Sequence, residues 1–168
     1  IIDTELLLSS VSGEPREKFL LKSNLEMCQN QIKSFNNLIN RRALTKEPIA
    51  YLINKKEFWS MNFNVCKDVL IPRPETEILV EKVAKYFKGR NPFILDIGTG
   101  SGCIIISLLQ ELKYSKGVAI DISNKAIKIA KKNSKIYNTS QRIKFVNISI
   151  SNFNNFKFDL IVSNPPYI

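Results

Sequence analysis

Four residues at the end of the sequence, Asn164-Pro165-Pro166-Tyr167, could hold a planar NH2 group. Neither proline has an N–H, and each keeps the preceding residue extended, so their carbonyls are free to accept hydrogen bonds. One proton of the NH2 group could bond the side-chain oxygen of Asn164, and the other the carbonyl of Pro165. Tyr167 could pack on the flat face of the group. The pattern predicts a clamp for an amine or amide nitrogen, although an isolated Pro-Pro pair is more often only a turn.

A second motif joins a short apolar strand, Phe93 to Ile97, to the glycine-rich turn Gly98-Thr99-Gly100-Ser101-Gly102. Glycines permit a tight turn and let a ligand approach the backbone. A helix, Cys103 to Leu112, is predicted to follow. The exposed N–H groups at its start favour a negatively charged group such as a carboxylate.

Two acidic residues indicate which cofactor this turn would bind. Asp121 directly follows the next predicted strand, 117–120, and a carboxylate at this position can bind a ribose diol. The glycines are spaced G-x-G-x-G rather than the G-x-G-x-x-G of dinucleotide sites, and Asp96 precedes them. That carboxylate suits an ammonium group and would repel a pyrophosphate. We therefore predict S-adenosylmethionine as the cofactor and methyl transfer onto nitrogen as the chemistry.

The elements that must position these residues alternate between strands and helices. Helices are predicted from Pro74 to Lys88 and from Lys125 to Tyr137, and further strands over 143–148 and 158–163. Their predicted buried stripes are Ile78, Leu79, Val83 and Phe87 in the first helix and Ala126, Ile129, Ala130 and Ile136 in the second. This alternation predicts an α/β fold with a doubly wound parallel sheet, whose carboxyl edge carries the ligands.

Two further regions precede the sheet. Residues 1–47 are predicted to form a helical domain, in which 31–44 is the clearest helix. Residues 48–72 are predicted to form a β-hairpin linker, with strands at 49–53 and 59–65 and a turn at Asn54-Lys55-Lys56. The third region, 73–168, is the predicted catalytic domain.

Composition narrows the functional classes. Hydrophobic residues make up 44% of the 168 residues, which predicts a packed core. The formal net charge of +10 could attract nucleic acid, but a lysine-rich solvated surface explains it as well. There is no histidine, the commonest metal ligand and general base, and we predict no metal site. No apolar run is long enough to span a bilayer, and three scattered cysteines suit a reducing compartment, so we expect a cytoplasmic protein without membrane contact.

These motifs together resemble a known family. The segment 96–102 with Asn164-Pro165-Pro166-Tyr167 is similar to class I methyltransferases. The segment Ile71-Pro72-Arg73-Pro74-Glu75-Thr76-Glu77, preceded by residues 47–52 and 57–59, is narrower, and it resembles the peptide chain release factor glutamine methyltransferases (HemK/PrmC). The resemblance covers nearly the whole chain. It implies an N-terminal helical domain that docks the release factor, a hairpin linker and a Rossmann-like methyltransferase domain.

The resemblance also implies a substrate and a set of site residues. The substrate would be the glutamine of the Gly-Gly-Gln motif in bacterial class 1 release factors. The predicted catalytic residues are Asn164, Pro165 and Tyr167. The predicted cofactor-binding residues are Asp96, Gly98, Thr99, Gly100, Gly102, Asp121, Ile122 and Asn164. The predicted substrate-binding residues are Asn164, Pro165, Pro166, Tyr167, Pro72 and Arg73.

Two departures from the family pattern and two alternative functions remain open at this point. Ser149 stands where the family has an acidic residue near the adenine. The sequence starts with Ile1 and stops after four predicted strands, so we expect an incomplete helical domain and sheet with little or no activity. The alternatives are an N-methyltransferase acting on an exocyclic amine of a DNA or RNA base, and a cofactor-binding fragment without turnover.

Overall fold

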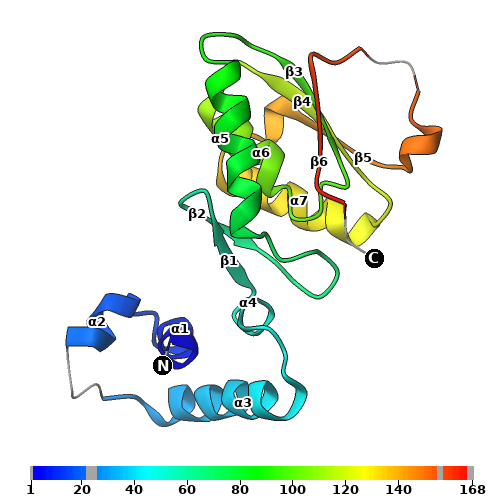
Figure 1. The fold of residues 1–168 in the computed structure, drawn as a ribbon. Helices are drawn as coiled ribbons and strands as arrows, with labels where there is room; N and C mark the ends of the chain where they lie inside the picture. The colour runs from blue at the N-terminus through cyan, green and yellow to red at the C-terminus, as the bar shows by residue number, and fades with distance from the viewer. Residues whose placement is uncertain (1, 22–25, 155–156, 166–168) are drawn as a thin grey trace. The chain divides into compact units, whose positions relative to one another are not determined.

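The chain divides into two compact units, Ile1–Asn54 and Lys55–Ile168. The computed structural model describes residues 2–21, 26–154 and 157–165. The first unit is helical, and the second combines a hairpin with a parallel sheet and its helices (Figure 1). None of the helices in the described ranges has both the length and the apolar character that crossing a bilayer requires.

The first unit confirms the predicted helical start of the chain. Its elements are α1 (Ile2–Ser12), α2 (Arg16–Leu21), α3 (Gln29–Thr45) and α4 (Ile49–Leu52). Leu7 of α1 is fully buried. An ion pair of 3.2 Å between Asp3 and Arg42 joins α1 to α3. The longest helix, α3, extends the predicted 31–44 by two residues at its start and one at its end.

The hairpin lies closer to the sheet in sequence than predicted. Its strands are β1 (Lys55–Phe58) and β2 (Met61–Asn64), so the predicted strand at 49–53 and the predicted turn at 54–56 are both wrong. The turn consists of Trp59 and Ser60, whose φ angles are 53° and 54°. Two consecutive positive φ angles give a turn whose twist matches that of paired strands. Because β1 begins only at Lys55, most of the segment predicted as the first strand forms the helical turn α4 (Ile49–Leu52) instead.

The sheet has four parallel strands in the order β5-β4-β3-β6. The strands are β3 (Phe93–Ile97), β4 (Lys116–Asp121), β5 (Ile143–Asn147) and β6 (Leu160–Ser163). Asp96 pairs with Ala119 on one side and with Val162 on the other. Because all four strands run in one direction, their carboxyl ends meet at one edge, and the predicted parallel α/β architecture is confirmed.

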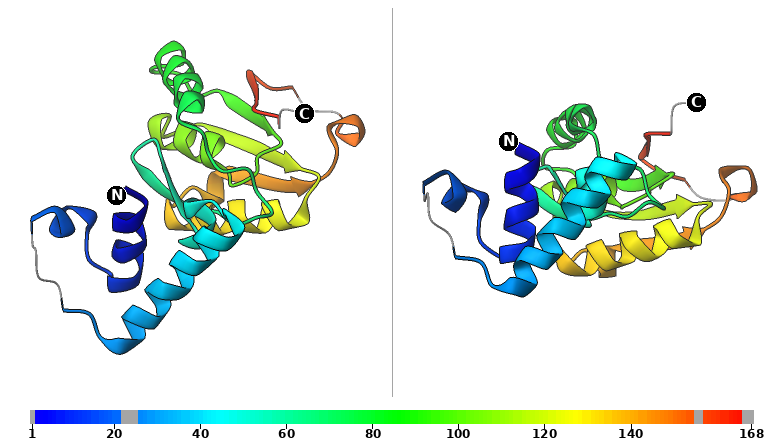
Figure 2. Two further views of the ribbon diagram at one scale, coloured as in Figure 1. Left: turned by 60° about the horizontal axis from the view of Figure 1, so that its bottom comes forward. Right: turned by 90° about the horizontal axis from the view of Figure 1, so that it is seen from below.

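Three helices cover one face of this sheet. They are α5 (Glu77–Tyr86), which continues the 3-10 turn η1 (Pro74–Thr76), α6 (Cys103–Glu111) and α7 (Asn124–Ile136). Helix α6 is the central one and is buried over most of its length. It lies between α5 and α7, as the turned views show (Figure 2). The hairpin residues Phe58 and Phe63 pack into the same core.

The opposite face of the sheet carries a different layer. The segment after β5 contains η3 (Ile150–Asn152) and lies on the other side of the sheet from α5 and α6 (Figure 1). Phe153 and Phe158 of this segment pack against Leu95, Val118 and Ile120. A further 3-10 turn, η2 (Ser140–Arg142), precedes β5.

Two residues of the predicted helix stripes are exposed. Ile78 is 53% exposed and Ile136 is 52% exposed, whereas Val80 and Ile127 are buried. A helix advances about 100° per residue, so Ile78 lies nearly opposite Val80. The other residues of the predicted stripes agree better with the structure: Leu79, Val83 and Phe87 pack against the core, and Ala126 and Ala130 are buried.

Candidate functional site

A cavity of about 400 Å3 opens at the carboxyl edge of the sheet. Its wall combines the glycine turn after β3, the end of β4, the start of α7 and the loop that follows the hairpin. The lining residues are Asp68, Val69, Leu70, Ile97, Gly98, Gly100, Ile120, Asp121, Ile122, Ser123, Ala126, Ile148, Ser149, Ile150 and Asn164. Five predicted cofactor-binding residues are among them: Gly98, Gly100, Asp121, Ile122 and Asn164.

The glycine turn is held against β4 by its own backbone. The N–H groups of Gly98 and Thr99 both donate to the carbonyl of Ile120, at 2.9 and 3.0 Å. Gly98 and Gly100 have φ angles of 69° and 54°, in the left-handed region that favours glycine. A Cβ on Gly98 would meet no atom within 4 Å, so the space above this residue is open. A ligand can therefore lie directly on the backbone of the turn.

Asp121 connects the end of β4 to both neighbouring loops. Its Oδ2 accepts a hydrogen bond from the N–H of Gly100 at 2.9 Å, and its Oδ1 accepts one from the N–H of Ser123 at 2.8 Å. Each carboxylate oxygen has a further lone pair. The carboxylate is therefore held in a fixed orientation at the cavity wall and can still accept hydrogen bonds from a diol.

The wall beside Asp121 is apolar. Ile122 and Ile150 line the cavity although 79% and 49% of their surfaces are exposed. Exposed isoleucines around a cavity suit the faces of a flat ring such as a purine. Ser149, where the family pattern has an acid, also lines the cavity, and its hydroxyl is 2.9 Å from that of Ser151.

Asp96 lies beneath the turn and does not line the cavity. It is 1% exposed, and its Oδ2 accepts a hydrogen bond of 2.7 Å from the hydroxyl of Thr99. Its Oδ1 has no hydrogen-bond partner among the described residues. Burial raises the pKa of Asp96 from 3.8 to about 6, and the hydrogen bond from Thr99 opposes this shift. A buried carboxylate without full compensation favours a positively charged ligand nearby.

The third glycine of the turn has a different environment. Gly102 ends the turn with a φ of 81°, and a Cβ there would lie 3.0 Å from Ile106 Cδ1 and 3.1 Å from Ala130 Cβ. Gly102 therefore allows α7 to pack closely against the start of α6. It does not line the cavity, and neither does Thr99.

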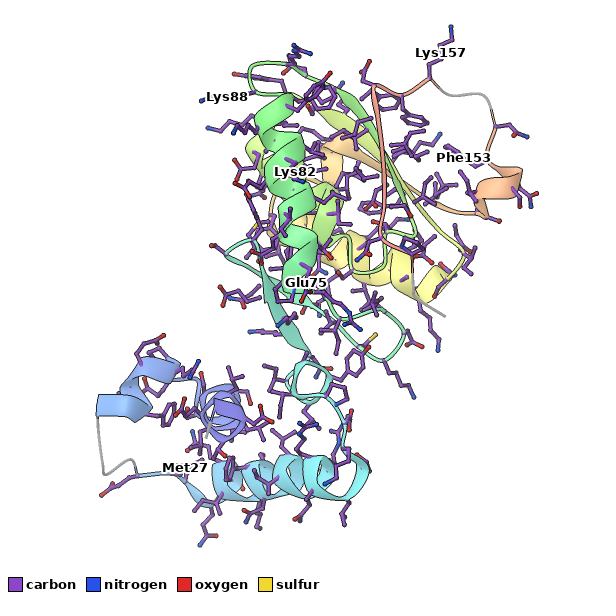
Figure 3. All side chains as sticks on the ribbon, viewed as in Figure 1. Met27, Glu75, Lys82, Lys88, Phe153 and Lys157 are labelled. Carbon is purple, nitrogen blue, oxygen red and sulfur yellow. The ribbon has the colours of Figure 1, made fainter. Side chains whose placement is uncertain are left out.

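A second cavity, of about 450 Å3, adjoins the first. Its lining residues are Arg73, Glu75, Thr76, Leu79, Ser163 and Asn164. Figure 3 labels Glu75 at the start of α5, and α5 continues from there along the sheet. Among the described residues, Asn164 lines both cavities. A group bound in one cavity would therefore meet a group bound in the other beside this side chain.

The structure describes only part of the predicted clamp. Asn164 is half-buried, and its Nδ2 donates a hydrogen bond to the hydroxyl of Thr76 at 3.0 Å. Pro165 is exposed, and Pro72 is buried. Pro166 and Tyr167 lie outside the described residues, so their predicted roles stay predictions. Arg73 lines the second cavity, and its role in binding the substrate stays a prediction.

Several residues at the site were not predicted from the sequence. Asp68 lies in the loop after the hairpin, lines the first cavity, and forms an ion pair of 3.0 Å with Lys125. This pairing lowers the pKa of Asp68 and raises that of Lys125. No sequence signal marks this loop, because only tertiary packing brings it beside β4.

Asn133 of α7 was missed for a similar reason. It is fully buried, and its amide bonds the backbone and the side chain of Asn64 in β2 at 2.7–3.0 Å and the carbonyl of Ser101 at 2.8 Å. It therefore ties the hairpin to the glycine turn. A buried asparagine could be suspected from its position on the apolar face of the predicted helix, but its partners could not.

The residues present fit the predicted cofactor. The open space above Gly98 admits a ligand, and Asp121 offers acceptors to its ribose. The unpartnered oxygen of Asp96 provides negative charge below the turn. Among the described residues, no group of three or more histidine, cysteine, aspartate or glutamate side chains could hold a metal ion.

Two family models match most of the chain. Residues 74–168 match the methyltransferase small domain, and residues 1–53 match the PrmC N-terminal domain. The first match alone covers more than half of the chain. It includes the glycine turn, Asp121 and Asn164.

Curated relatives match along almost the full chain. A bifunctional methyltransferase of Rickettsia prowazekii is 43% identical over 99% of this chain, which spans 36% of that protein. The release factor glutamine methyltransferases of Buchnera aphidicola (from Acyrthosiphon pisum) and Caulobacter vibrioides are 41% and 37% identical, also over 99% of the chain. The chain spans 59% and 58% of their lengths.

Solved structures agree on the fold. A ribosomal protein L11 methylase from Lactobacillus delbrueckii superposes with a TM-score of 0.51 at 25% identity, over 60% of this chain and 51% of that one. The tRNA (uracil-54, C5)-methyltransferase of Pyrococcus abyssi superposes with a TM-score of 0.53 at 22% identity, over 67% and 28%. The family model over residues 74–168 shows that the chain belongs to the methyltransferase small-domain family, and residues 1–53 match the PrmC N-terminal domain.

Proposed function

We propose that this chain transfers a methyl group from S-adenosylmethionine to the side-chain nitrogen of a glutamine in a class 1 peptide chain release factor. The observation that carries the reaction type is that Asn164 lines both cavities at the carboxyl edge of the sheet. The substrate is supported by the relatives named release factor glutamine methyltransferase, which match 99% of the chain. The target is the glutamine of the Gly-Gly-Gln motif.

The first cavity is the proposed cofactor site. Asp121 would accept hydrogen bonds from the ribose, and Gly98 and Gly100 would let the cofactor lie on the backbone of the turn. Ile122 and Ile150 would cover the faces of the adenine. The charge of Asp96 would favour the cationic end of the molecule without direct contact, because Asp96 does not line the cavity.

The second cavity is the proposed glutamine site. Asn164 Oδ1 would accept one N–H of the glutamine amide, and the carbonyl of Pro165 would accept the other. When bound, S-adenosylmethionine supplies the methyl group: a carbon–nitrogen bond forms as the carbon–sulfur bond breaks, and the amide nitrogen then releases one proton to solvent. An amide nitrogen is a weak nucleophile because its lone pair is conjugated, so the protein contributes mainly by orienting it.

The two acceptors also act on the transition state. Positive charge grows on the amide nitrogen as the new bond forms, and oxygen atoms that hold its two protons stabilise that charge. The amide of Asn164 is bonded to Thr76, so its oxygen would need little reorganisation during the reaction. The roles of Pro165 and Tyr167 within the clamp are part of this proposal.

The walls of the second cavity suit a macromolecular substrate. Arg73 and Glu75 are exposed at its rim, where they can meet the chain on either side of the glutamine. We propose that the helical unit contributes to docking the release factor and that the enzyme acts in the cytoplasm, with its release factor substrate.

The experiment compares methyl incorporation into three substrates. The complete gene product that carries these 168 residues is incubated with methyl-labelled S-adenosylmethionine and a class 1 release factor, an RNA or a DNA. The proposal predicts label in the release factor. The matched control, a release factor whose Gly-Gly-Gln glutamine is changed to glutamate, should take up none.

Two outcomes would overturn the proposal. Label in RNA or DNA but not in the release factor would assign the site to an exocyclic base amine. No label in any substrate, together with no binding of S-adenosylhomocysteine in a calorimetric titration, would show that the protein has the methyltransferase fold but no methyltransferase activity.

A further inference from the structure

Thr76 stands at the start of α5, but its side chain does not cap that helix. It is the N-cap residue, and its hydroxyl accepts no hydrogen bond from the first helical turn. Threonine at this position ordinarily accepts a bond from the N–H two or three residues further on. The Thr76 hydroxyl is therefore available for another partner.

That partner is Asn164, 88 residues later in the chain. Asn164 Nδ2 donates to Thr76 Oγ1 at 3.0 Å, and both side chains are half-buried. Among the described residues, Asn164 Oδ1 accepts no hydrogen bond. The amide group of Asn164 is thus held at its nitrogen end, and its oxygen is left as a free acceptor beside both cavities.

The position of Thr76 is itself well defined. Its N–H donates to the carbonyl of Arg73 at 3.0 Å, which closes the η1 turn. The next residue, Glu77, accepts a hydrogen bond from the N–H of Trp59 at 2.9 Å and so ties the turn to the hairpin. The hydroxyl therefore projects from a turn that is held at both ends.

We propose that Thr76 is a positioning residue that sets the orientation of the Asn164 amide for the substrate. An asparagine amide has a donor end and an acceptor end, and the two are nearly equal in shape. A substrate amide nitrogen is a donor, so Asn164 must present its oxygen. In the structure Thr76 accepts from Nδ2, and this bond holds the amide with Oδ1 available to the substrate. A hydroxyl can also donate, so the reversed amide could still bond Thr76, but it would set Nδ2 against the NH2 group of the substrate. This inference rests on the proposed function.

The chemistry of the substrate follows from the same orientation. With Oδ1 as the available atom, the site accepts groups that donate at least one N–H or O–H and disfavours groups that only accept. An ester or a carboxylate at the same position has no donor for Asn164. The site therefore selects a carboxamide over the carboxylate of the same shape.

Two variants separate the hydroxyl from the shape of the side chain. Thr76→Val keeps the branched shape and removes the acceptor, and Thr76→Ser keeps the acceptor. In the complete gene product, Thr76→Val should lower kcat for release factor methylation about tenfold, which is the effect of losing one hydrogen bond. Thr76→Ser should stay within about threefold of the original protein. The Kd for S-adenosylhomocysteine should change by less than about threefold in both variants.

A double-mutant cycle tests whether Thr76 acts through Asn164. In an Asn164→Ala background, Thr76→Val should produce no further loss of kcat. Independent losses in the two variants, or equal impairment by Thr76→Val and Thr76→Ser, would overturn the inference. An unchanged kcat in Thr76→Val would do the same.

A measurement without turnover keeps the inference separate from the proposed function. In the complex with S-adenosylhomocysteine, the side-chain amide protons of Asn164 should exchange with water faster in Thr76→Val than in Thr76→Ser, as observed by 15N NMR. Equal exchange rates would overturn the inference. If the original protein fails to methylate the release factor while the exchange rates differ, the proposed function fails and the hydrogen bond stands.

Discussion

The two cavities that meet at Asn164 are built in different ways. The first is formed mostly by strand ends and the loops that directly follow them, and its wall is largely apolar. The second is formed by the segment Arg73–Leu79 and the end of β6, which are about 85–90 residues apart in the chain. The first has a buried carboxylate beneath it, and the second has exposed charges at its rim.

This difference separates two tasks. A cavity that is apolar and held by backbone hydrogen bonds suits a small molecule of constant shape. A cavity that is open and charged suits one side chain of a large partner. With the cofactor in the first cavity and the glutamine in the second, substitutions in the first should change cofactor affinity, and substitutions in the second should change the rate of methyl transfer.

Asn164→Ala should have the largest effect. It removes the acceptor on the substrate side, and we expect kcat to fall hundred- to thousandfold, or about 3–4 kcal/mol, as for other preorganised polar groups at a reacting centre. The Kd for S-adenosylhomocysteine should rise far less. Methylation kinetics and calorimetric titration measure the two effects.

The matched control for this change is Asn152→Ala, at an exposed position in η3. It should leave both quantities unchanged. If Asn164→Ala weakened cofactor binding as much as it lowered kcat, the division between the two cavities would be wrong.

The pH dependence of stability tests the buried carboxylate under the first cavity. Because the pKa of Asp96 rises from 3.8 to about 6 on folding, the folded protein holds a proton between these values that the unfolded chain releases. The free energy of unfolding should therefore fall as pH rises from 4 to 6, with up to about 3 kcal/mol from this group. Below pH 4 the carboxyl of Asp96 is protonated in both the folded and the unfolded state, so it no longer lowers the free energy of unfolding.

The measurement is urea unfolding at several pH values for the original protein and for Asp96→Asn. Other carboxylates titrate in the same range, so the quantity of interest is the difference between the two curves. That difference should change between pH 4 and 6 and be constant outside it. Parallel curves would show that Asp96 does not carry the shift.

Gly98→Ala should weaken cofactor binding by about ten- to thirtyfold, or roughly 2 kcal/mol, because the new methyl group enters the cavity. Gly89→Ala is the matched control. Gly89 is exposed after α5, and its φ of 76° is close to the 69° of Gly98. Both variants should lose similar thermal stability from backbone strain, and only Gly98→Ala should lose affinity. Equal affinities would contradict the placement of the cofactor on the turn.

Gly102→Ala should have the smallest effect on binding. Its Cβ would crowd Ile106 and Ala130, and its φ of 81° would be strained in alanine, so we expect a loss of about 2–4 kcal/mol in the free energy of unfolding. Cofactor affinity should stay within about threefold of the original protein. Thermal unfolding measures the loss of stability, and calorimetric titration of the same sample measures the cofactor affinity. A large loss of cofactor affinity without a loss of stability would show that Gly102 contacts the cofactor.

Local patterns in the sequence predicted the sheet well. The strands over 93–97, 143–148 and 158–163 are found within two residues of their predicted ends, because a short apolar run between turn residues has few alternatives in an α/β chain. The glycine turn and Asp121 were predicted to lie at one edge, and they line one cavity. Parallel strands bring their carboxyl ends together wherever the helices between them pack.

Local patterns failed where two structures compete for the same residues. The apolar run Ile49–Leu52 is compatible with a strand or a helix, and the hairpin turn at Trp59 and Ser60 carries no glycine to mark it. Two members of the predicted helix stripes, Ile78 and Ile136, are exposed, because the packing partners outside each helix decide which apolar side chains are buried.

By itself, the sequence determined the order of the elements, the parallel sheet and the edge at which its polar residues gather, since each depends on neighbouring residues. Tertiary structure alone decided that Asp96 and Gly102 lie away from the cavity, that the loop at Asp68 lines it, and that Thr76 bonds Asn164. These facts depend on contacts between segments tens of residues apart, whose side chains find their partners only after the strands and helices have packed.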